Sequence, residues 1–251
     1  MGRAGGRIVR RLTEFAVLAE ADEVLATWPD VVPALSDEEQ SRRRALHRPA
    51  DRAAFAAAHV LARVCAAELA GASAQALTLR QRCPQCQGPH GRPSIVQLPA
   101  VHVSLAHSGG WVAAIAAPVS CGIDVELVPA RTGSPKLPID RALAEAERRW
   151  LSRQADHALA FSRLWVRKEA LIKAGVGSLD DLPALDVADP RGGDGLASSV
   201  AGFGVQGVEL DAADADRVVA AFARKGEPGA DRGKGHRHDQ GPGIHRTRPT
   251  G

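Results

Sequence analysis

Two acidic segments of this sequence carry residue types and spacings that could hold a metal ion. In the first, residues 122–127 (GIDVEL), aliphatic residues alternate with two carboxylates. A β-strand there would turn the aliphatic side chains to one face and Asp124 and Glu126 to the other. Two carboxylates this close suit Mg2+, which usually takes one or two carboxylates and keeps several waters. Judged on spacing alone, a solvated acidic strand face is the more common alternative.

The second acidic segment, residues 164–173, has the periodicity of a helix. Trp165, Glu169 and Lys173 recur at intervals of four and therefore share one stripe of the helix surface. Apolar residues such as Leu164 and Leu171 supply a neighbouring face. A Glu and a Lys one turn apart are most often an ordinary surface ion pair, so this helix indicates chemistry only together with its neighbours in the chain.

A His after a predicted strand, in Ala106-His107-Ser108, precedes both acidic segments. In chain order the three motifs are AHS at 106–108, GIDVE at 122–126 and WVRKEALIK at 165–173. This ordered set resembles the signature of the Sfp-type 4'-phosphopantetheinyl transferase family. The resemblance extends from about residue 35 to residue 174, and more loosely to residue 223.

The resemblance implies an enzyme that transfers the 4'-phosphopantetheine moiety of coenzyme A (CoA) to a serine of an apo acyl or peptidyl carrier protein, releasing 3',5'-ADP. It implies that Asp124, Glu126 and Glu169 bind Mg2+, for which Mn2+ could substitute. The catalytic residues would be Glu169, Lys173 and Asp124. Glu169 would take the serine proton directly or through a water, and Lys173 would steady the phosphates. No motif indicates whether lipid, polyketide or nonribosomal peptide biosynthesis is served.

The same resemblance implies a set of residues that bind CoA. His107 would hold the 3'-phosphate, and Arg92, within Gly91-Arg92-Pro93, would contact the nucleotide end. The complete expected set is Arg42, Arg52, His59, Arg63, Arg92, His107, Ser108 and Lys173. Many relatives carry Ser where this chain has Ala106, so we expect CoA binding to be weaker by about 1 kcal/mol, the typical value of one neutral hydrogen bond.

Local patterns predict the elements that must position these residues. Ser36 and Glu39 form a capping-box pattern that predicts the start of a helix. Further helices are expected over residues 51–69, 140–153 and 158–174. Strands are expected over residues 101–105, 111–117 and 122–128, with a turn at 106–110, and a closing pair over 204–210 and 217–223.

The fold class expected from the resemblance is α+β, with two similar α/β halves related by a pseudo-two-fold axis and the active site in the cleft between them. The halves would cover residues 1–118 and 119–224, followed by a disordered basic tail at 225–251. The tail holds six Lys or Arg against three acids and so accounts for the whole net charge of +3. The formally neutral remainder gives no sign of a nucleic-acid partner.

Composition favours a cytoplasmic, monomeric protein with no membrane partner, because the sequence shows no signal peptide and no apolar run of about 18 residues. Cys83, Cys86 and His90 offer three of the four ligands that a structural zinc site needs, but a loop with reduced thiols is the reading we favour. A zinc-assisted nucleic-acid binder is the second hypothesis, although the nine Phe and Trp residues and the lack of Tyr make it unlikely. A degenerate transferase that binds CoA or carrier proteins without turnover is the third.

Overall fold

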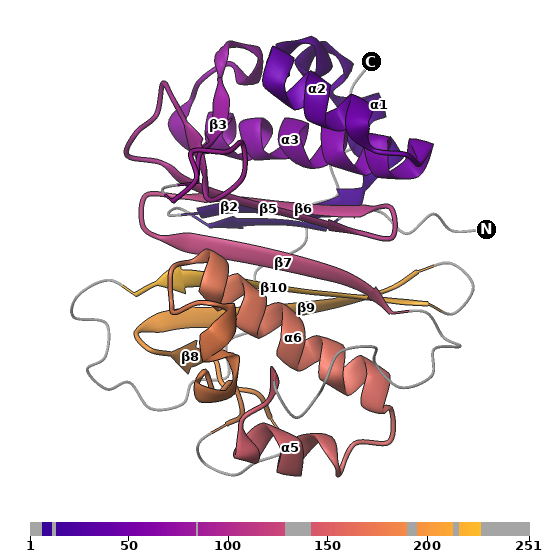
Figure 1. The fold of residues 1–251 in the computed structure, drawn as a ribbon, viewed down its shortest axis with the longest axis vertical. Helices are drawn as coiled ribbons and strands as arrows, with labels where there is room; N and C mark the ends of the chain where they lie inside the picture. The colour runs from indigo at the N-terminus through magenta and orange to yellow at the C-terminus, as the bar shows by residue number, and fades with distance from the viewer. Residues whose placement is uncertain are drawn as a thin grey trace.

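The fold is a stack of four layers in the order helix, sheet, sheet, helix (Figure 1). The computed structural model describes residues 7–11, 14–83, 85–128, 142–189, 195–212 and 216–226. Both sheets are antiparallel, and helices cover their outer faces. The predicted α+β class is confirmed, whereas the pseudo-two-fold axis stays an implication of the resemblance. The predicted tail lies outside the described residues, apart from Lys225 and Gly226.

The first sheet has six strands in the order β1-β2-β6-β5-β4-β3. Their bounds are β1 Arg7–Arg11, β2 Glu14–Glu20, β3 Leu79–Gln81, β4 Pro93–Ile95, β5 His102–Ser108 and β6 Trp111–Ala117. Sequence analysis did not predict β1 and β2. In β2 the residues from Glu14 to Ala19 are all buried, because one face meets a helix and the other meets the second sheet. A strand buried on both faces lacks the alternation of apolar and polar residues by which strands are recognised in a sequence.

The second sheet has four strands in the order β7-β10-β9-β8. Their bounds are β7 Cys121–Val128, β8 Ser199–Val200, β9 Phe203–Asp211 and β10 Arg217–Lys225. The predicted strand at 122–128 and the predicted closing pair are therefore confirmed. The chain passes from the first sheet to the second between Ala117 and Cys121, and the division into halves at residues 118 and 119 stays a prediction.

The helical layers are unequal in size. On the first sheet lie α1 Ala21–Thr27, α2 Asp37–Ala45 and α3 Pro49–Ala70, with short 3-10 helices at Pro29–Ala34 and Ala74–Ala76. On the second lie α5 Glu145–Leu151, α6 His157–Lys173 and the 3-10 helix η3 Leu179–Ala184. The Ser36–Glu39 capping box is confirmed. The helix predicted over 140–153 is shorter, and residues 140 and 141 lie outside the described residues.

Helix α3 is long and apolar enough to cross a bilayer, judged by length and composition alone. In this fold 78% of its most apolar window is buried inside the protein. A helix that is apolar on all sides is expected to be buried. Helix α3 is buried in this way, because it packs on the outer face of the first sheet as part of that sheet's hydrophobic core.

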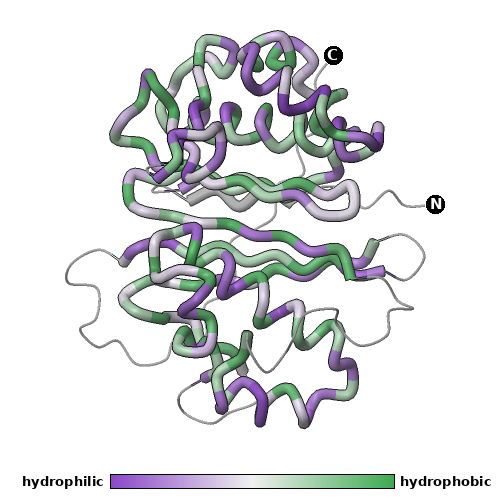
Figure 2. The backbone as a smooth tube through the Cα atoms, in the orientation of Figure 1, coloured by the Kyte–Doolittle hydropathy of each residue, from purple (hydrophilic) through white to green (hydrophobic). Residues whose placement is uncertain are grey.

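Apolar side chains fill the space between the two sheets. Ile123 and Val125 of β7 enter this layer together with Ala106, Ile115 and Phe222. The predicted alternation of β7 is thereby confirmed, because its aliphatic residues face the other sheet. Figure 2 shows the hydrophobic residues running along these central strands. The opposite face of β7, which carries Asp124, lies against α6.

Gly122 lets α6 lie directly on β7. A Cβ atom at this position would come within 2.0 Å of the Ala170 carbonyl oxygen and 2.6 Å of the Ala174 backbone nitrogen. Next to it, the Ser120 hydroxyl donates a 2.6 Å hydrogen bond to the Ala174 carbonyl. The C-terminal turns of α6 are therefore fixed on the start of β7, which brings the acidic strand and the acidic helix together.

Replacing Gly122 with Ala should force α6 away from β7, since the obstructing atoms are backbone and cannot rotate aside. Overpacking of this kind costs roughly 3 kcal/mol, so chemical denaturation should show a loss of about that size in the free energy of unfolding. Gly204→Ala is the matched control, because a Cβ atom there would meet nothing nearer than the Arg224 carbonyl at 4.0 Å. Equal stability of the two variants would contradict the proposed constraint.

Candidate functional site

An acidic cluster lies between β7 and α6. Lys173 Nζ of α6 is 2.6 Å from Asp124 Oδ1 of β7, and the Asp124 side chain is only 9% exposed. The second oxygen, Oδ2, is buried and has no hydrogen-bond partner. Burial raises the pKa of Asp124, and the Lys173 ammonium opposes that shift. The strand thus presents a carboxylate of which one oxygen is free to accept a further ligand.

Glu126 connects the cluster to the first sheet. The Ser108 hydroxyl of β5 donates a 2.7 Å hydrogen bond to Glu126 Oε2 and accepts one of 3.3 Å from the Leu127 backbone N–H. Burial raises the pKa of Glu126, while the Ser108 hydrogen bond lowers it. The Trp165 side chain of α6 lies close enough to Glu126 to lower its pKa slightly. Groups from the first sheet and from α6 therefore surround this carboxylate of the second sheet.

Glu169 is half-buried and completes the predicted set of three carboxylates. Burial raises its pKa, and the negative charges of Asp124 and Glu126 raise it further. The three acids thus repel one another within a partly buried site. A hard cation relieves this kind of repulsion, and Mg2+ prefers oxygen ligands. The donor set and the free Asp124 oxygen fit such an ion.

The carboxylates are not yet gathered as closely as a shared ion requires. Among the described residues, the three carboxylates do not form a group of closely spaced potential ligands. Such a group, with ligand atoms within 4.8 Å of one another, is formed by Cys83, Cys86 and His90. Lys173 meanwhile provides the positive charge beside Asp124. Asp124, Glu126 and Glu169 would have to approach one another to share one ion, and their assignment as metal ligands stays a prediction.

A cavity of about 270 Å³ adjoins the acidic cluster. It lies between the first sheet and the end of α6, and it is lined by Gln81, Gly91, Arg92, Pro93, Ser104, Leu105, Ile172, Lys173 and Gly175. The Arg92 guanidinium donates two hydrogen bonds, of 2.6 and 3.1 Å, to the Lys173 carbonyl. Two predicted CoA ligands, Arg92 and Lys173, therefore lie side by side at this cavity.

His107 and Ser108 belong to a strand and not to the expected turn. The last residues of β5 pair with the first of β6, and only Gly109 and Gly110 form the turn. Both glycines have positive φ, of 56° and 87°, as a tight two-residue hairpin requires. His107 is exposed, and the surrounding protein together with the Lys173 charge lowers its pKa.

Ala106, the departure from the family pattern, faces the apolar layer between the sheets and is 6% exposed. On either side of it, Ser104 and Ser108 accept hydrogen bonds from the Ile123 and Leu127 backbone N–H groups. A serine in place of Ala106 would put its hydroxyl into this layer. The expected effect on CoA affinity stays a prediction.

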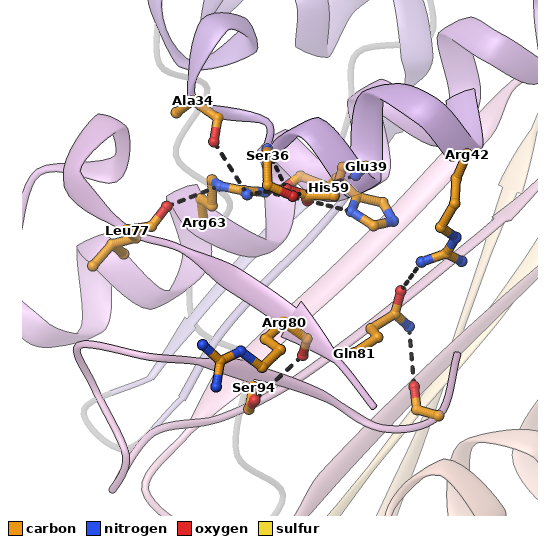
Figure 3. A network of polar contacts seen from close by, with 11 residues as sticks. Ala34, Ser36, Glu39, Arg42, His59, Arg63, Leu77, Arg80, Gln81 and Ser94 are labelled. Carbon is orange, nitrogen blue, oxygen red and sulfur yellow. Dashed lines mark hydrogen bonds and ion pairs between the residues drawn. The ribbon is translucent and has the colours of Figure 1, made fainter. Parts of the chain in front are cut away.

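His59 and Arg63 form part of a buried network around Glu39 (Figure 3). The family resemblance implied that both bind CoA, but this stretch of α3 is buried. Arg63 directs all three guanidinium nitrogens to partners, namely the Glu39 carboxylate and the carbonyls of Ala34, His59 and Leu77. His59 Nδ1 is 2.6 Å from Glu39 Oε1. The geometry gives these two residues a structural role.

Glu39 is ionised in this network. Burial by itself would raise its pKa, but the hydrogen bonds from His59 and Arg63 hold the pKa down at about 2. Burial lowers the pKa of His59, so the imidazole is neutral and donates its Nδ1 proton to the carboxylate. Glu39 also accepts the Ser36 backbone N–H at the start of α2. One carboxylate thereby joins α2 to α3.

The other two predicted basic ligands lie nearer the surface. Arg42 donates to the Gln81 side chain at 2.6 Å, and Gln81 in turn donates to the Gly91 carbonyl at 3.0 Å (Figure 3). Arg42 is thus one residue away from the cavity. Arg52 donates to the backbone carbonyls of Leu46 and His47, which close the turn between α2 and α3.

Lys168, which precedes Glu169, has a role that sequence analysis missed. Its side chain is fully buried, and Nζ lies 2.7 Å from the equally buried Glu147 Oε2 of α5. It also donates to the carbonyls of Leu182 and Leu185. Burial lowers the pKa of Lys168, which the Glu147 hydrogen bond opposes. Its position beside buried Leu164 and Leu171 on the helical repeat was the available signal, since i, i+3 and i, i+4 neighbours share a face.

Comparisons with known proteins agree with the motif-based resemblance over the second half of the chain. Residues 120–222 match the family model of the 4'-phosphopantetheinyl transferase superfamily. A stretch of 105 residues is 35% identical to the 4'-phosphopantetheinyl transferase psf-1 of Bacillus pumilus, covering 39% of this chain and 41% of that protein. The chain therefore spans about two fifths of the length of this relative. The predicted resemblance is confirmed for this region, which contains Asp124, Glu126, Glu169 and Lys173.

The Glu39 network should make stability depend on pH. Its carboxyl group has a pKa of about 2 in the folded protein against an ordinary 4.5, so the stabilisation is complete above pH 4.5 and is lost as pH falls towards 2. The loss amounts to roughly 3 kcal/mol at 1.36 kcal/mol per pH unit. Denaturant unfolding at a series of pH values should show a shallower acid limb for Glu39→Gln. The neighbouring, more exposed Glu38→Gln is the control, and a shallower limb in both variants would count against the network.

The two lysines of α6 should differ in their effect on stability. Lys168→Met leaves Glu147 buried without its partner, which costs roughly 3–5 kcal/mol in the free energy of unfolding. Lys173 is 30% exposed, so water can take its place beside Asp124, and Lys173→Met should cost less than Lys168→Met although Asp124 itself is mostly buried. The double variant Glu147→Gln with Lys168→Met should recover part of the first loss, because no unpaired charge is left. A similar loss for both single lysine variants would contradict this distinction.

Proposed function

We propose that this protein is a Mg2+-dependent 4'-phosphopantetheinyl transferase that acts on CoA and on a serine of an apo acyl or peptidyl carrier protein. The observation that carries the proposal is the meeting of Asp124 and Glu126 from β7 with Glu169 and Lys173 from α6. This cluster borders a cavity whose wall includes Arg92. The family match over residues 120–222 supports the same activity.

The cavity suits a polyanionic substrate on its Arg92 and Lys173 side. Arg92 and Lys173 are cationic, and both have N–H groups that can donate hydrogen bonds to phosphate oxygens. His107 lies close enough to Lys173 for the lysine charge to lower the pKa of the imidazole. The negative charge of a bound phosphate would act in the opposite direction and favour the protonated imidazole. These residues are therefore proposed to hold the phosphates of CoA, with Ser108 and Arg42 at the margins of the site.

Asp124, Glu126 and Glu169 are the proposed ligands of the metal. When bound, Mg2+ neutralises pyrophosphate charge and aligns the reacting phosphorus for in-line attack. Asp124 has an unpaired oxygen available for this purpose. If Asp124 bound the metal in place of Lys173, the Lys173 ammonium would be free to contact the substrate phosphates.

The reaction follows from the same residues. The carrier serine oxygen forms a bond to the phosphorus that bears the pantetheine arm, and the bond from that phosphorus to the 3',5'-ADP oxygen breaks. Glu169 takes the serine proton, directly or through a water, and burial raises its pKa in the direction that makes it a better base. Lys173 and Arg92 stabilise the charge of the departing 3',5'-ADP.

Transfer can be measured by mass spectrometry of a panel of apo carrier proteins after incubation with this protein, CoA and Mg2+. The carrier that is served should gain one phosphopantetheine mass. Asp124→Ala combined with Glu169→Ala should lower the rate at least 100-fold, since a general base alone contributes 10²–10⁴-fold. Asp180→Asn, an exposed acid in the same half of the chain, is the control and should keep the full rate.

Two outcomes would contradict the proposal. Full-rate transfer by the double variant would exclude the proposed metal and base site. Calorimetric CoA binding without transfer to any carrier in the panel would indicate a protein that binds CoA without turnover, in place of an enzyme.

A further inference from the structure

A second cluster of metal-binding side chains lies in the loop between β3 and β4. The ligand atoms of Cys83, Cys86 and His90 all lie within 4.8 Å of one another. Cys86 Sγ and His90 Nε2 are 2.9 Å apart. Around a tetrahedral zinc ion, sulfur and nitrogen ligands lie about 3.5–4 Å from each other, given bond lengths near 2.3 and 2.0 Å. The three side chains therefore converge on one point, and Cys86 and His90 would have to separate by roughly 0.6–1.1 Å to admit a zinc ion.

The backbone of this loop is shaped around the two sulfurs. The Cys83 carbonyl accepts the Gln87 N–H at 2.9 Å, and the Cys83 N–H donates to the Gly88 carbonyl at 3.0 Å. Gln87 has a left-handed φ of 57°, which returns the chain towards the first cysteine. The Gly88 N–H is directed at Cys86 Sγ, at 3.4 Å. N–H groups directed at sulfur favour the thiolate, which is the form that binds metal.

The four cysteines of the chain fall into two kinds. Cys65 and Cys121 are buried, and each directs its thiol towards a backbone carbonyl. Burial raises the pKa of both, to about 12 for Cys121. Cys83 is buried as well, but its sulfur lies beside the sulfur of exposed Cys86 and the His90 ring in the loop. Cys65 and Cys121 are therefore core residues, whereas the loop cysteines have the surroundings of metal ligands.

We propose that Cys83, Cys86 and His90 bind one zinc ion, with a water molecule as the fourth ligand. No fourth His, Cys, Asp or Glu joins the group among the described residues. Cys86 and His90 are exposed, so solvent reaches the remaining coordination position. Three protein ligands and one water satisfy the four-coordinate preference of zinc.

The ion would brace the segment that leads into the cavity. His90 is followed by Gly91 and Arg92, and a Cβ atom on Gly91 would approach the Arg82 carbonyl to 2.9 Å. The Gly91 carbonyl also accepts the Gln81 side-chain bond. A zinc ion linking Cys83 to His90 would close the loop across this contact and hold Arg92 in place. The site lies outside the acidic cluster and does not depend on the proposed transferase activity.

Metal analysis of the full-length protein tests the proposal. After reconstitution with Zn2+ and desalting in the presence of a thiol-free reductant, we expect about one zinc per chain. With Co2+ in its place, we expect the intense near-ultraviolet absorption of cobalt–thiolate bonds. Cys86→Ser combined with His90→Gln should lower zinc affinity at least 10-fold and abolish that absorption. Cys65→Ala and His47→Gln remove the same residue types elsewhere and should change neither readout.

Two results would overturn the proposal. One is unchanged zinc content and affinity in the Cys86→Ser, His90→Gln variant. The other is cobalt binding without thiolate absorption, which would place the metal on other groups, such as the histidines in residues 236–245. Circular dichroism identifies any variant that folds poorly. Metal content is compared only among variants that have the native spectrum. Zinc should also raise the melting temperature of the unaltered chain and leave that of the double variant unchanged.

Discussion

The close approach of α6 to β7 at Gly122 is the contact on which the site depends. With only hydrogen on this Cα, the helix backbone reaches van der Waals distance of the strand, and no other residue permits that. The acids of β7 and the stripe of α6 are 39 or more residues apart in the chain. Their meeting requires this approach, and the Lys173–Asp124 ion pair follows from it.

Buried charge has two different uses in this fold. Arg63 and Lys168 are both fully buried, and each pairs with a glutamate while its other hydrogen bonds go to backbone carbonyls. Such fully satisfied groups join helices to their surroundings. Asp124 is also buried but retains an oxygen without a partner. An incompletely satisfied acid is expensive unless a ligand completes it, and in this respect Asp124 differs from Arg63 and Lys168.

Much of the fold could be predicted from local patterns. The capping box at Ser36, the strand at 111–117 and the alternating faces of β7 each depend on residues within one or two turns or pleats of one another. Patterns failed where burial removed the contrast between faces. Strand β2 has none because both of its faces are buried, and α3 is buried over most of its length, so no local pattern showed that His59 and Arg63 lie inside the protein.

The sequence by itself determined which side chains share a face: the two carboxylates of β7, and Trp165, Glu169 and Lys173 of α6. Local geometry suffices for that, because the period of a strand or helix is the same in every protein. Only the tertiary structure decided which charged residues are paired with partners inside the protein. Lys168 and Lys173 lie five residues apart on one helix, yet one forms a fully buried ion pair and the other a partly exposed ion pair with an acid of the site. Their partners, Glu147 and Asp124, come from distant segments whose positions depend on how the layers pack, and no spacing along the chain encodes that packing.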